Sequence, residues 1–324
     1  MKVAFLGHLT QGIAPRVIAR LTTSPDTEIV ADDTDAARLA AALAEADIAV
    51  GVSWRAGFPP APRLKLLQCF ATGVDRMDLA ALPPGVTVCN VFGHEQPIAE
   101  YVMMTALALT HGLFHSVTTF RAGSWEAGLQ GGGTRHGELL GKTAGIIGYG
   151  RIGREVARRA APFGVRVLAA NRSPVADAAP VERVYPLPEL DRMLPECDVV
   201  VIAAALAPET RGLIDARRFA LMKPGALLIN IARGQIVDEE ALFAALRDGM
   251  LGGAAIDVWW RYPTPAEPQP RPSRFPFHEL PNVLVTPHCA TFTEGTAERR
   301  FADIAGNIDR CVRGEPLINI VATT

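Results

Sequence analysis

A glycine-rich turn at Gly148–Gly153 is the feature that most restricts how this chain can fold. It reads Gly-Tyr-Gly-Arg-Ile-Gly, follows the apolar segment Ala144–Ile147 and opens the helical segment Ile152–Ala161. This strand–turn–helix context makes the G-x-G-x-x-G match specific. The glycines permit a tight turn, a close backbone approach to a diphosphate and close packing of the helix on the strand. Because the start of a helix favours an anion, the turn predicts a parallel α/β sheet that binds a dinucleotide.

Short apolar segments typical of strands alternate with helical segments along the whole chain, as in parallel α/β layers. The predicted strands are Val3–Leu6, Ile48–Val52, Leu64–Phe70, Val86–Cys89, Ala144–Ile147, Val165–Ala169, Val199–Ala203, Leu227–Ile231, Ala254–Val258 and Val283–Thr286. The first series is too short for a complete large domain, and a last helix at Thr293–Arg313 follows the second series. We therefore expect two interleaved Rossmann-like or flavodoxin-like parallel-sheet domains, residues 1–93 plus 289–324 and residues 94–288.

The segment Ile98–Leu113 is almost entirely apolar. A helix that is apolar on every face is normally buried, either between layers of its own domain or between subunits. The second arrangement predicts a homodimer.

The end of the second strand of a dinucleotide fold distinguishes NAD from NADP, because an acid there holds the ribose 2′-OH. Asn171 occupies that position here, and Arg172 and Ser173 follow it. A guanidinium can pair with a 2′-phosphate and a serine can add a hydrogen bond. We therefore expect NADP to be preferred over NAD, whereas the alternative is an exposed arginine with no role in cofactor binding.

Composition excludes several classes of function. The chain has 32 Lys and Arg residues against 34 Asp and Glu, a net charge of −2, so no basic surface for nucleic acid or an anionic membrane is expected. The longest apolar run, Val199–Pro208, is far shorter than the roughly 20 residues of a membrane span. Five cysteines without a C-x-x-C spacing indicate reduced thiols in a cytoplasmic protein. No residue cluster has the spacing of metal ligands.

Several motifs together resemble the D-isomer-specific 2-hydroxyacid dehydrogenase family, in the family's order over most of the chain. They are Ala71–Asp75 with Asp78, Glu100, Gly148–Gly153, Lys223–Gly234, Val237–Leu242, Ala255–Val258 and Thr286–His288. The resemblance implies a substrate domain, a dinucleotide domain and an active-site cleft between them. It also implies an enzyme that transfers a hydride between NAD(P)H and a 2-keto acid.

The resemblance gives two residues catalytic roles. Arg233 follows a predicted strand, and its guanidinium would bind and polarise the substrate. His288 also follows a predicted strand, and its imidazole would act as acid and base near neutral pH. The implied substrate-binding residues are Thr72, Gly73, Val74 and Arg233, and the implied cofactor-binding residues are Gly148, Gly150, Arg151, Ile152, Gly153, Asn171, Arg172, Ser173, Thr210, Ala232 and Asp257.

One position departs from the family. A glutamate normally partners the histidine, five residues after the equivalent of Asp257 and just before a proline. Here Tyr262 has that spacing, and Glu267, also before a proline, is the alternative if an insertion displaced the acid. The spacing favours Tyr262. A phenol with a pKa near about 10 can hydrogen-bond the ring but cannot stabilise its charged form as a carboxylate does. Reduction should then fade at lower pH than in a relative with glutamate.

This departure keeps two other functions open. One is an oxidoreductase for a different small anion, and the other is a dinucleotide-sensing protein without turnover. The substrate pocket is harder to assign, because each candidate aromatic residue has core packing as its alternative. The pocket candidates are Trp54, Arg55, Phe92, His94, Trp259, Trp260 and Phe292.

Overall fold

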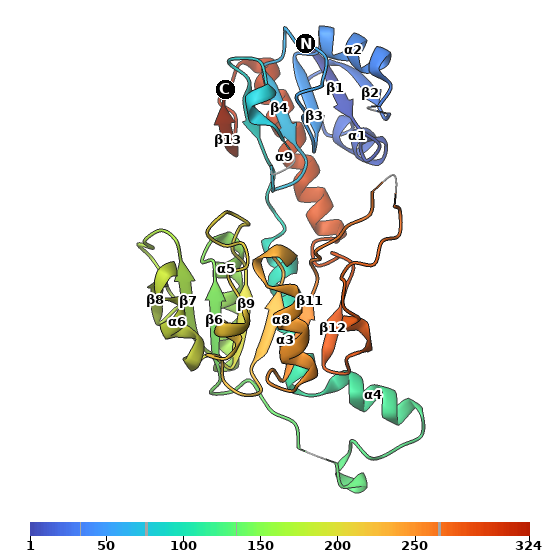
Figure 1. Cartoon of the computed structure of the whole chain (residues 1–324). Coiled ribbons are helices and arrows are strands. Elements are labelled where there is room, and N and C mark those ends of the chain that lie inside the picture. Colours follow the sequence, from blue (N-terminus) through green and yellow to red (C-terminus); the bar gives the residue numbers. More distant parts are fainter. Residues whose placement is uncertain (33, 75–76, 134, 265–266) are drawn as a thin grey trace. The chain divides into compact units, whose positions relative to one another are not determined.

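The computed structural model describes residues 1–32, 34–74, 77–133, 135–264 and 267–324. The described chain divides into two compact α/β units (Figure 1). Unit 1 comprises Met1–Gly93 with Thr293–Thr324, and unit 2 comprises His94–Phe292. The second crossing between units thus follows Phe292, whereas the sequence placed it after His288.

Unit 1 is built on a six-stranded sheet of order β13-β5-β4-β3-β1-β2. All neighbouring strands are parallel except β13, which pairs antiparallel with β5. The strands are β1 (Lys2–Leu6), β2 (Asp26–Val30), β3 (Ile48–Gly51), β4 (Leu66–Cys69), β5 (Thr87–Cys89) and β13 (Ile320–Thr323). The helices are α1 (Thr10–Ile18), α2 (Ala36–Glu45) and α9 (Glu294–Arg313).

The core of unit 1 lies on both faces of this sheet. Leu39 and Leu43 of α2 pack on one face, and Val17 of α1 and Ile304 of α9 pack on the other. Asp35 accepts a hydrogen bond from the Arg38 backbone N–H and so caps α2.

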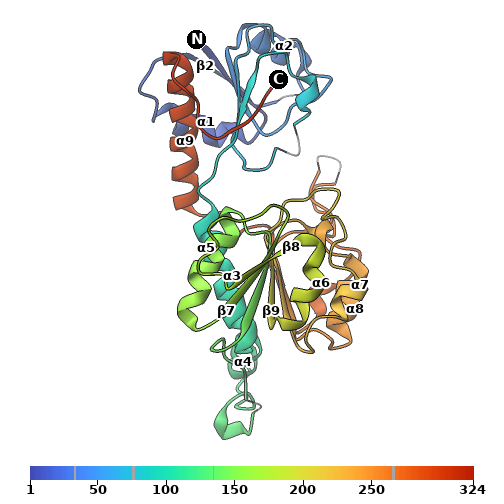
Figure 2. The same ribbon diagram turned by 90° about the vertical axis from the view of Figure 1, so that its left-hand side faces the viewer.

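Unit 2 is built on a seven-stranded, fully parallel sheet of order β12-β11-β10-β9-β6-β7-β8. The strands are β6 (Thr143–Ile147), β7 (Arg166–Asn171), β8 (Arg183–Pro186), β9 (Val199–Ile202), β10 (Leu227–Asn230), β11 (Gly253–Ile256) and β12 (Val283–Val285). The helices are α3 (Glu95–Thr110), α4 (Leu113–Arg121), α5 (Arg151–Ala160), α6 (Leu190–Met193), α7 (Ala216–Phe219) and α8 (Glu239–Arg247). Figure 2 shows helices on both sides of this sheet. Two parallel-sheet α/β units are therefore confirmed.

Most of the apolar helix is buried by its own unit. Ile98, Val102 and Ala106 of α3 belong to the core that α5 and the sheet share, so covering by a second subunit is not needed to explain its composition. The helix also stops earlier than predicted, because Gly112 takes a φ of +59° and a separate helix, α4, begins at Leu113.

Three strands were not predicted from the sequence. Strands β2 and β8 are only partly buried and carry charged residues, and β13 is mostly exposed at a sheet edge. Such segments lack the continuous apolar run that marked the buried strands.

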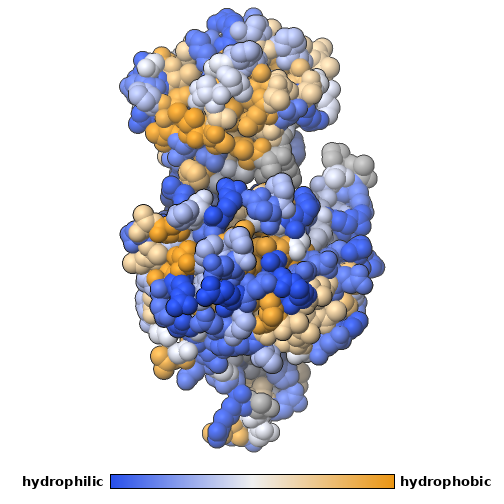
Figure 3. Space-filling view, turned by 60° about the vertical axis from the view of Figure 1, so that its left-hand side comes forward, coloured by the Kyte–Doolittle hydropathy of each residue, from blue (hydrophilic) through white to orange (hydrophobic). Residues whose placement is uncertain are grey.

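The surface of the face seen in Figure 3 is mostly hydrophilic, with hydrophobic residues in separate patches. Within the described ranges, no helix combines the length and hydropathy that crossing a membrane requires.

Candidate active site

The glycine-rich turn has the geometry that a dinucleotide requires. Gly148 takes a φ of +97°, and a Cβ there would lie 2.5 Å from the Ala204 backbone N. A Cβ on Gly153 would lie 2.4 Å from the Gly148 carbonyl O, so helix α5 can approach β6 this closely only with glycine. A Cβ on Gly150 would meet nothing within 4 Å.

The start of α5 is therefore open toward an anion. Gly150 is its N-cap residue and has no side chain with which to cap the helix. The first N–H groups of a helix need acceptors, and a diphosphate supplies them. The close approach of Gly148 to Ala204 joins the loops that follow β6 and β9, where the order of the sheet reverses. These residues fit an NAD-type cofactor.

Asn171 connects the turn to the end of β7. Its Oδ1 accepts a hydrogen bond from the Tyr149 backbone N–H at 3.1 Å, and its Nδ2 donates to the Ser173 carbonyl O at 2.8 Å. Ser173 is exposed. Arg172 is also exposed, and its Nη1 lies 2.8 Å from Oε1 of Glu209. Asn171 thus positions the turn at the predicted ribose end.

Two further predicted cofactor residues support loops. The buried Thr210 donates its hydroxyl hydrogen to the Ala205 carbonyl O at 2.8 Å and accepts from the Ala207 N–H at 2.8 Å. Ala232 accepts at its carbonyl O from Arg233 Nη1 at 2.8 Å.

Arg151 and Ile152 lie in the first turn of α5. Nε of Arg151 lies 2.6 Å from Oε1 of Glu95, the first residue of α3. Glu95 is buried, and burial by itself would raise its pKa. The Arg151 hydrogen bond and nearby positive charge outweigh this effect, so the net pKa falls below its ordinary value. Ile152 is half-buried against the core of α3 and α5.

Arg233 stands in the loop after β10. Asn230, the last residue of that strand, donates from Nδ2 to the Arg233 carbonyl O at 3.0 Å and accepts at Oδ1 from the Ala232 N–H at 3.1 Å. A Cβ on the next residue, Gly234, would lie 2.6 Å from the carbonyl carbon of Trp259. The Arg233 loop therefore packs directly against the loop after β11.

Asp257 holds the loop that carries His288. Its buried carboxylate accepts from the Thr286 hydroxyl at 2.6 Å, the Cys289 N–H at 2.8 Å and the Ala290 N–H at 3.1 Å. His288 itself takes a φ of +58°, which is uncommon outside glycine. Such a strained conformation persists only where its surroundings impose it, and functional loops are a frequent place for it.

Tyr262 is the partner of His288. Its Oη lies 2.9 Å from Nδ1 of the imidazole and also accepts the Trp259 backbone N–H at 3.1 Å. Glu267 instead pairs with Arg261, Oε2 to Nη2 at 2.9 Å. The contact that the spacing favoured is therefore confirmed, and the displaced-acid alternative is wrong.

Most of the candidate pocket aromatics pack within their own units. Trp54 is buried and donates from Nε1 to the Ala81 carbonyl O at 3.3 Å. Trp259 donates from Nε1 to the Thr286 carbonyl O at 2.9 Å, and Trp260 stacks on Phe277. Phe292 is exposed.

Three of the predicted substrate-binding residues, Thr72, Gly73 and Val74, belong to unit 1. The Thr72 hydroxyl donates to the Val91 carbonyl O at 2.8 Å, and its own carbonyl O accepts from Nδ2 of the buried Asn90 at 2.7 Å. The Val74 carbonyl O accepts from the Met77 N–H at 2.9 Å. Asp75, which carries part of the family resemblance, lies outside the described residues.

Several supporting residues were not predicted. Asn230 could have been found, since it is a polar residue at the end of a buried strand. Asn90, Glu95 and Tyr101 could not, because their partners are distant in sequence. Tyr101 Oη, for example, lies 2.7 Å from Oγ1 of Thr286. Among the described residues, no group of three or more His, Cys, Asp or Glu side chains is placed to hold a metal ion.

Comparison with known proteins decides the family. The model of the D-isomer specific 2-hydroxyacid dehydrogenase NAD binding domain matches residues 103–290, more than half of the chain. The protein belongs to the D-isomer specific 2-hydroxyacid dehydrogenase family. It is thus an oxidoreductase with an NAD-binding Rossmann fold, in a family that acts on small 2-keto and 2-hydroxy acids.

Individual relatives differ in what their names say they act on. The chain is 37% identical to a glyoxylate reductase of Thermococcus gammatolerans, over 80% of this chain and 76% of that one. It is 35% identical to formate dehydrogenase 2 of Oryza sativa, over 79% of this chain and 66% of that one. A solved 2-hydroxyacid dehydrogenase of Xanthobacter autotrophicus in complex with NADPH and MES is 29% identical. It has a TM-score of 0.78 over 99% of this chain and 98% of that one.

Proposed function

We propose that this protein reduces a 2-keto acid to a D-2-hydroxy acid with NAD(P)H, Arg233 binding and polarising the substrate and His288 acting as acid and base. The observation that carries the proposal is the loop held by Asp257. It fixes His288 at the end of β12, while Arg233 stands at the end of β10 in a loop that packs on the Trp259 backbone. The carboxyl ends of parallel strands are where such folds place their ligands.

The chemistry needs an electrophile and a proton donor. The bound nicotinamide supplies a hydride. Arg233 would draw electron density from the carbonyl oxygen, and the charged His288 would give its Nε2 proton to the alkoxide that forms. Its Nδ1–H would donate to Tyr262 Oη, so this hydrogen bond orients the ring. Oxidation of the hydroxy acid would run the same proton path in reverse.

The other predicted residues would bind the substrate and cofactor. Backbone N–H groups of Thr72, Gly73 and Val74 would hold the substrate carboxylate. The Gly148–Gly153 turn with Arg151 and Ile152 would hold the diphosphate, and Asn171, Arg172 and Ser173 the ribose end, with NADP preferred. Thr210, Ala232 and Asp257 would shape the cofactor site through the loops that they fix.

A steady-state scan of 2-keto acids with NADPH and then NADH tests the proposal. General acid catalysis contributes about 10²–10⁴-fold, so His288→Ala should lose about that factor in kcat with cofactor binding retained. Turnover that survives His288→Ala, or an absence of turnover with every keto acid, would contradict the assigned role.

A second candidate function follows from the uncharged partner of His288. Tyr262 gives no carboxylate to stabilise an imidazolium, and oxidation of some small anions releases no alkoxide proton. Formate, which the rice relative's name specifies, is such an anion. Oxidation of formate with NAD(P)+ in the absence of keto-acid reduction would favour this candidate. Tight cofactor binding with no turnover of either kind would instead favour a sensor.

We also propose a homodimer, on the exposed apolar surface of helix α4 and the loop after it. No residue of α4 is buried, and Figure 1 shows the helix lying apart from the sheet of unit 2. The exposed apolar side chains are Leu113, Phe114, Val117, Phe120, Trp125 and Leu129. Contiguous patches of this kind usually mark an interface. Light scattering after size exclusion should give twice the chain mass, and Phe114→Glu with Phe120→Glu should give a monomer.

A further inference from the structure

An acid lies at the predicted ribose end of the cofactor site, although the residue that ends β7 is Asn171 and not an acid. Glu209 comes from the loop after β9, and its Oε1 lies 2.8 Å from Nη1 of Arg172, which follows β7. The two strands flank β6, whose glycine-rich turn is the predicted diphosphate site. The ion pair therefore spans the loops on either side of that turn.

Both members of the pair stand on fixed backbone. Asn171 bonds to Tyr149 in the glycine-rich turn and to Ser173, which holds the Arg172 turn. On the other side, Thr210 bonds within its own loop and holds the turn that carries Glu209. The geometry of the pair is therefore set by the two loops and not by the two side chains alone.

We propose that Glu209 is a specificity-determining residue that supplies the missing acid for a ribose 2′-OH and competes with a 2′-phosphate for Arg172. The inference rests on the proposed dinucleotide function. It makes the 2′ position a balanced site, in which Arg172 favours NADP and Glu209 favours NAD.

The charges of Glu209, of a 2′-phosphate and of a 2′-OH explain why Glu209 would disfavour NADP and favour NAD. The Arg172 hydrogen bond lowers the pKa of Glu209 below its ordinary value, so Glu209 is an anion at neutral pH. A 2′-phosphate carries about −1.5 to −2 charges at pH 7 and would be repelled by this anion while pairing with Arg172. A 2′-OH is neutral and can donate to the Glu209 carboxylate, as it does to the acid that dinucleotide folds usually place after the second strand.

Binding measurements separate these effects from turnover. Titration of NADPH, NADH and the fragments 2′,5′-ADP and 5′-AMP, followed by calorimetry, would compare wild type with Glu209→Gln. We expect NADPH and 2′,5′-ADP to bind about tenfold more tightly to the variant, because one close repulsion is lost. NADH should bind about threefold more weakly, because a charge-assisted hydrogen bond becomes a neutral one.

Two further variants complete the design. Arg172→Gln should weaken the binding of NADPH and 2′,5′-ADP and leave the affinity for NADH within about twofold, since only a 2′-phosphate can form a bidentate ion pair with the guanidinium. Glu189→Gln is the matched control, because Glu189 is also 41% exposed and also pairs with an arginine, Arg192. It should change neither affinity. High salt should reduce the gain of Glu209→Gln, because exposed charges are screened.

The results distinguish this inference from the proposed function. An NADPH-to-NADH affinity ratio that Glu209→Gln leaves unchanged, or shifts toward NADH, overturns the role of Glu209 while dinucleotide binding stands. Equal tightening of both cofactors also overturns it, since Glu209 would then only obstruct the site. Wild-type protein that binds neither cofactor overturns the proposed function, and the inference with it.

Discussion

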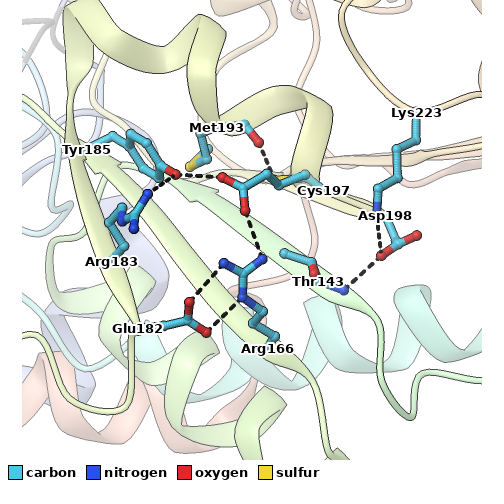
Figure 4. A network of polar contacts seen from close by, with 10 residues as sticks. Thr143, Arg166, Glu182, Arg183, Tyr185, Met193, Cys197, Asp198 and Lys223 are labelled. Atoms are coloured by element: carbon cyan, nitrogen blue, oxygen red, sulfur yellow. Dashed lines mark hydrogen bonds and ion pairs between the residues drawn. The ribbon is translucent and has the colours of Figure 1, made fainter.

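The strands of the parallel sheet in unit 2 all begin along one edge, the amino edge, and all end along the opposite one, the carboxyl edge. Both edges carry charged and polar residues, but these residues have different partners at the two edges. At the amino edge, where the strands begin, charges neutralise one another (Figure 4). Arg166 bonds Glu182 and Glu196, with Nη1 2.9 Å from Oε2 of Glu196, and Tyr185 donates to Glu196 at 2.6 Å. Asp198 accepts from the Thr143 N–H at 2.9 Å and from Lys223 at 3.0 Å. These groups are already satisfied by the protein.

At the carboxyl edge, the polar groups mostly fix loops. Asp257, Asn230 and Asn171 use their side chains to hold the backbone on which His288, Arg233 and Arg172 stand. The N-terminus of α5 stays open above Gly150. The comparison teaches that the number of charges does not mark a site. We expect the site at the edge where polar side chains hold loop backbone instead of pairing with one another.

The largest expected difference between the edges is in catalysis. Arg233→Ala should lower kcat/KM by about 10²–10³-fold, as the loss of one electrostatic donor usually does. Arg166→Ala at the amino edge should leave kcat/KM within about twofold, because its partners are Glu182 and Glu196. Steady-state kinetics of both purified variants make the comparison, and equal losses would mean that the edges do not differ in this way.

The next largest effect concerns the glycine-rich turn. Gly148→Ala should weaken NAD(P)H binding by about tenfold or more, because its Cβ would meet Ala204 and its positive φ disfavours alanine. Gly249 also has a positive φ, of +73°, but a Cβ there would meet nothing within 4 Å. Gly249→Ala is therefore the control for backbone strain alone, and fluorescence titration of NADH would separate the two. Equal NADH affinities of Gly148→Ala and Gly249→Ala would show that the turn is not part of the cofactor site.

A smaller effect is expected in the pH profile. Tyr262→Glu would place a carboxylate beside Nδ1 of His288 and favour the charged form of the ring. The proton donor in reduction is the charged ring, so activity should persist to higher pH in the variant than in wild type. Tyr262→Phe should lower kcat by about tenfold through loss of ring orientation.

Tyr185→Phe, at the amino edge, is the matched control for this measurement. It removes a hydroxyl that donates to Glu196 and should leave the pH profile of kcat unmoved. A shift of that profile in Tyr185→Phe, or no shift in Tyr262→Glu, would show that the Tyr262 contact does not set the titration of His288.

The smallest effect is on stability. Burial by itself would raise the pKa of Asp198. The hydrogen bonds from the Thr143 N–H and from Lys223 outweigh this effect, so the net pKa is depressed in the folded state. Asp198→Asn should therefore cost about 2 kcal/mol at pH 7, the size of a hydrogen bond to a charged group. A depressed carboxyl pKa stabilises the fold above the unfolded pKa, near about 3.9, and this stabilisation is lost as pH falls through the folded pKa.

Urea unfolding at a series of pH values from 7 downward tests whether the stabilisation by Asp198 is lost as pH falls. The difference in the free energy of unfolding between Asp198→Asn and wild type should be greatest at pH 7 and shrink below about pH 4. A difference that grows on acidification would contradict the assigned cause.

Sequence patterns alone predicted the α/β class and the dinucleotide turn, because both are local or repeated: apolar strands alternate with helices, and glycines stand at 148, 150 and 153 after an apolar strand. The roles proposed for Arg233 and His288 came from the family resemblance, which adds to their positions after predicted strands. Tyr262 was predicted as the partner of His288 because it stands five residues after Asp257, where the family places its glutamate, and the structure shows this contact. Strands β2, β8 and β13 were missed, since partial exposure gives no apolar run.

Only the tertiary structure decided what holds those residues. Asp257 bonds the loop at Thr286 and Ala290, and Glu209 reaches Arg172, although nothing in the local sequence joins them. Helix α3 is as apolar as a subunit interface, yet its own unit covers it. The physical reason is the parallel sheet, which brings distant strand ends to one edge. A sequence pattern records which residues end strands, whereas strand order and side-chain reach decide which of them meet.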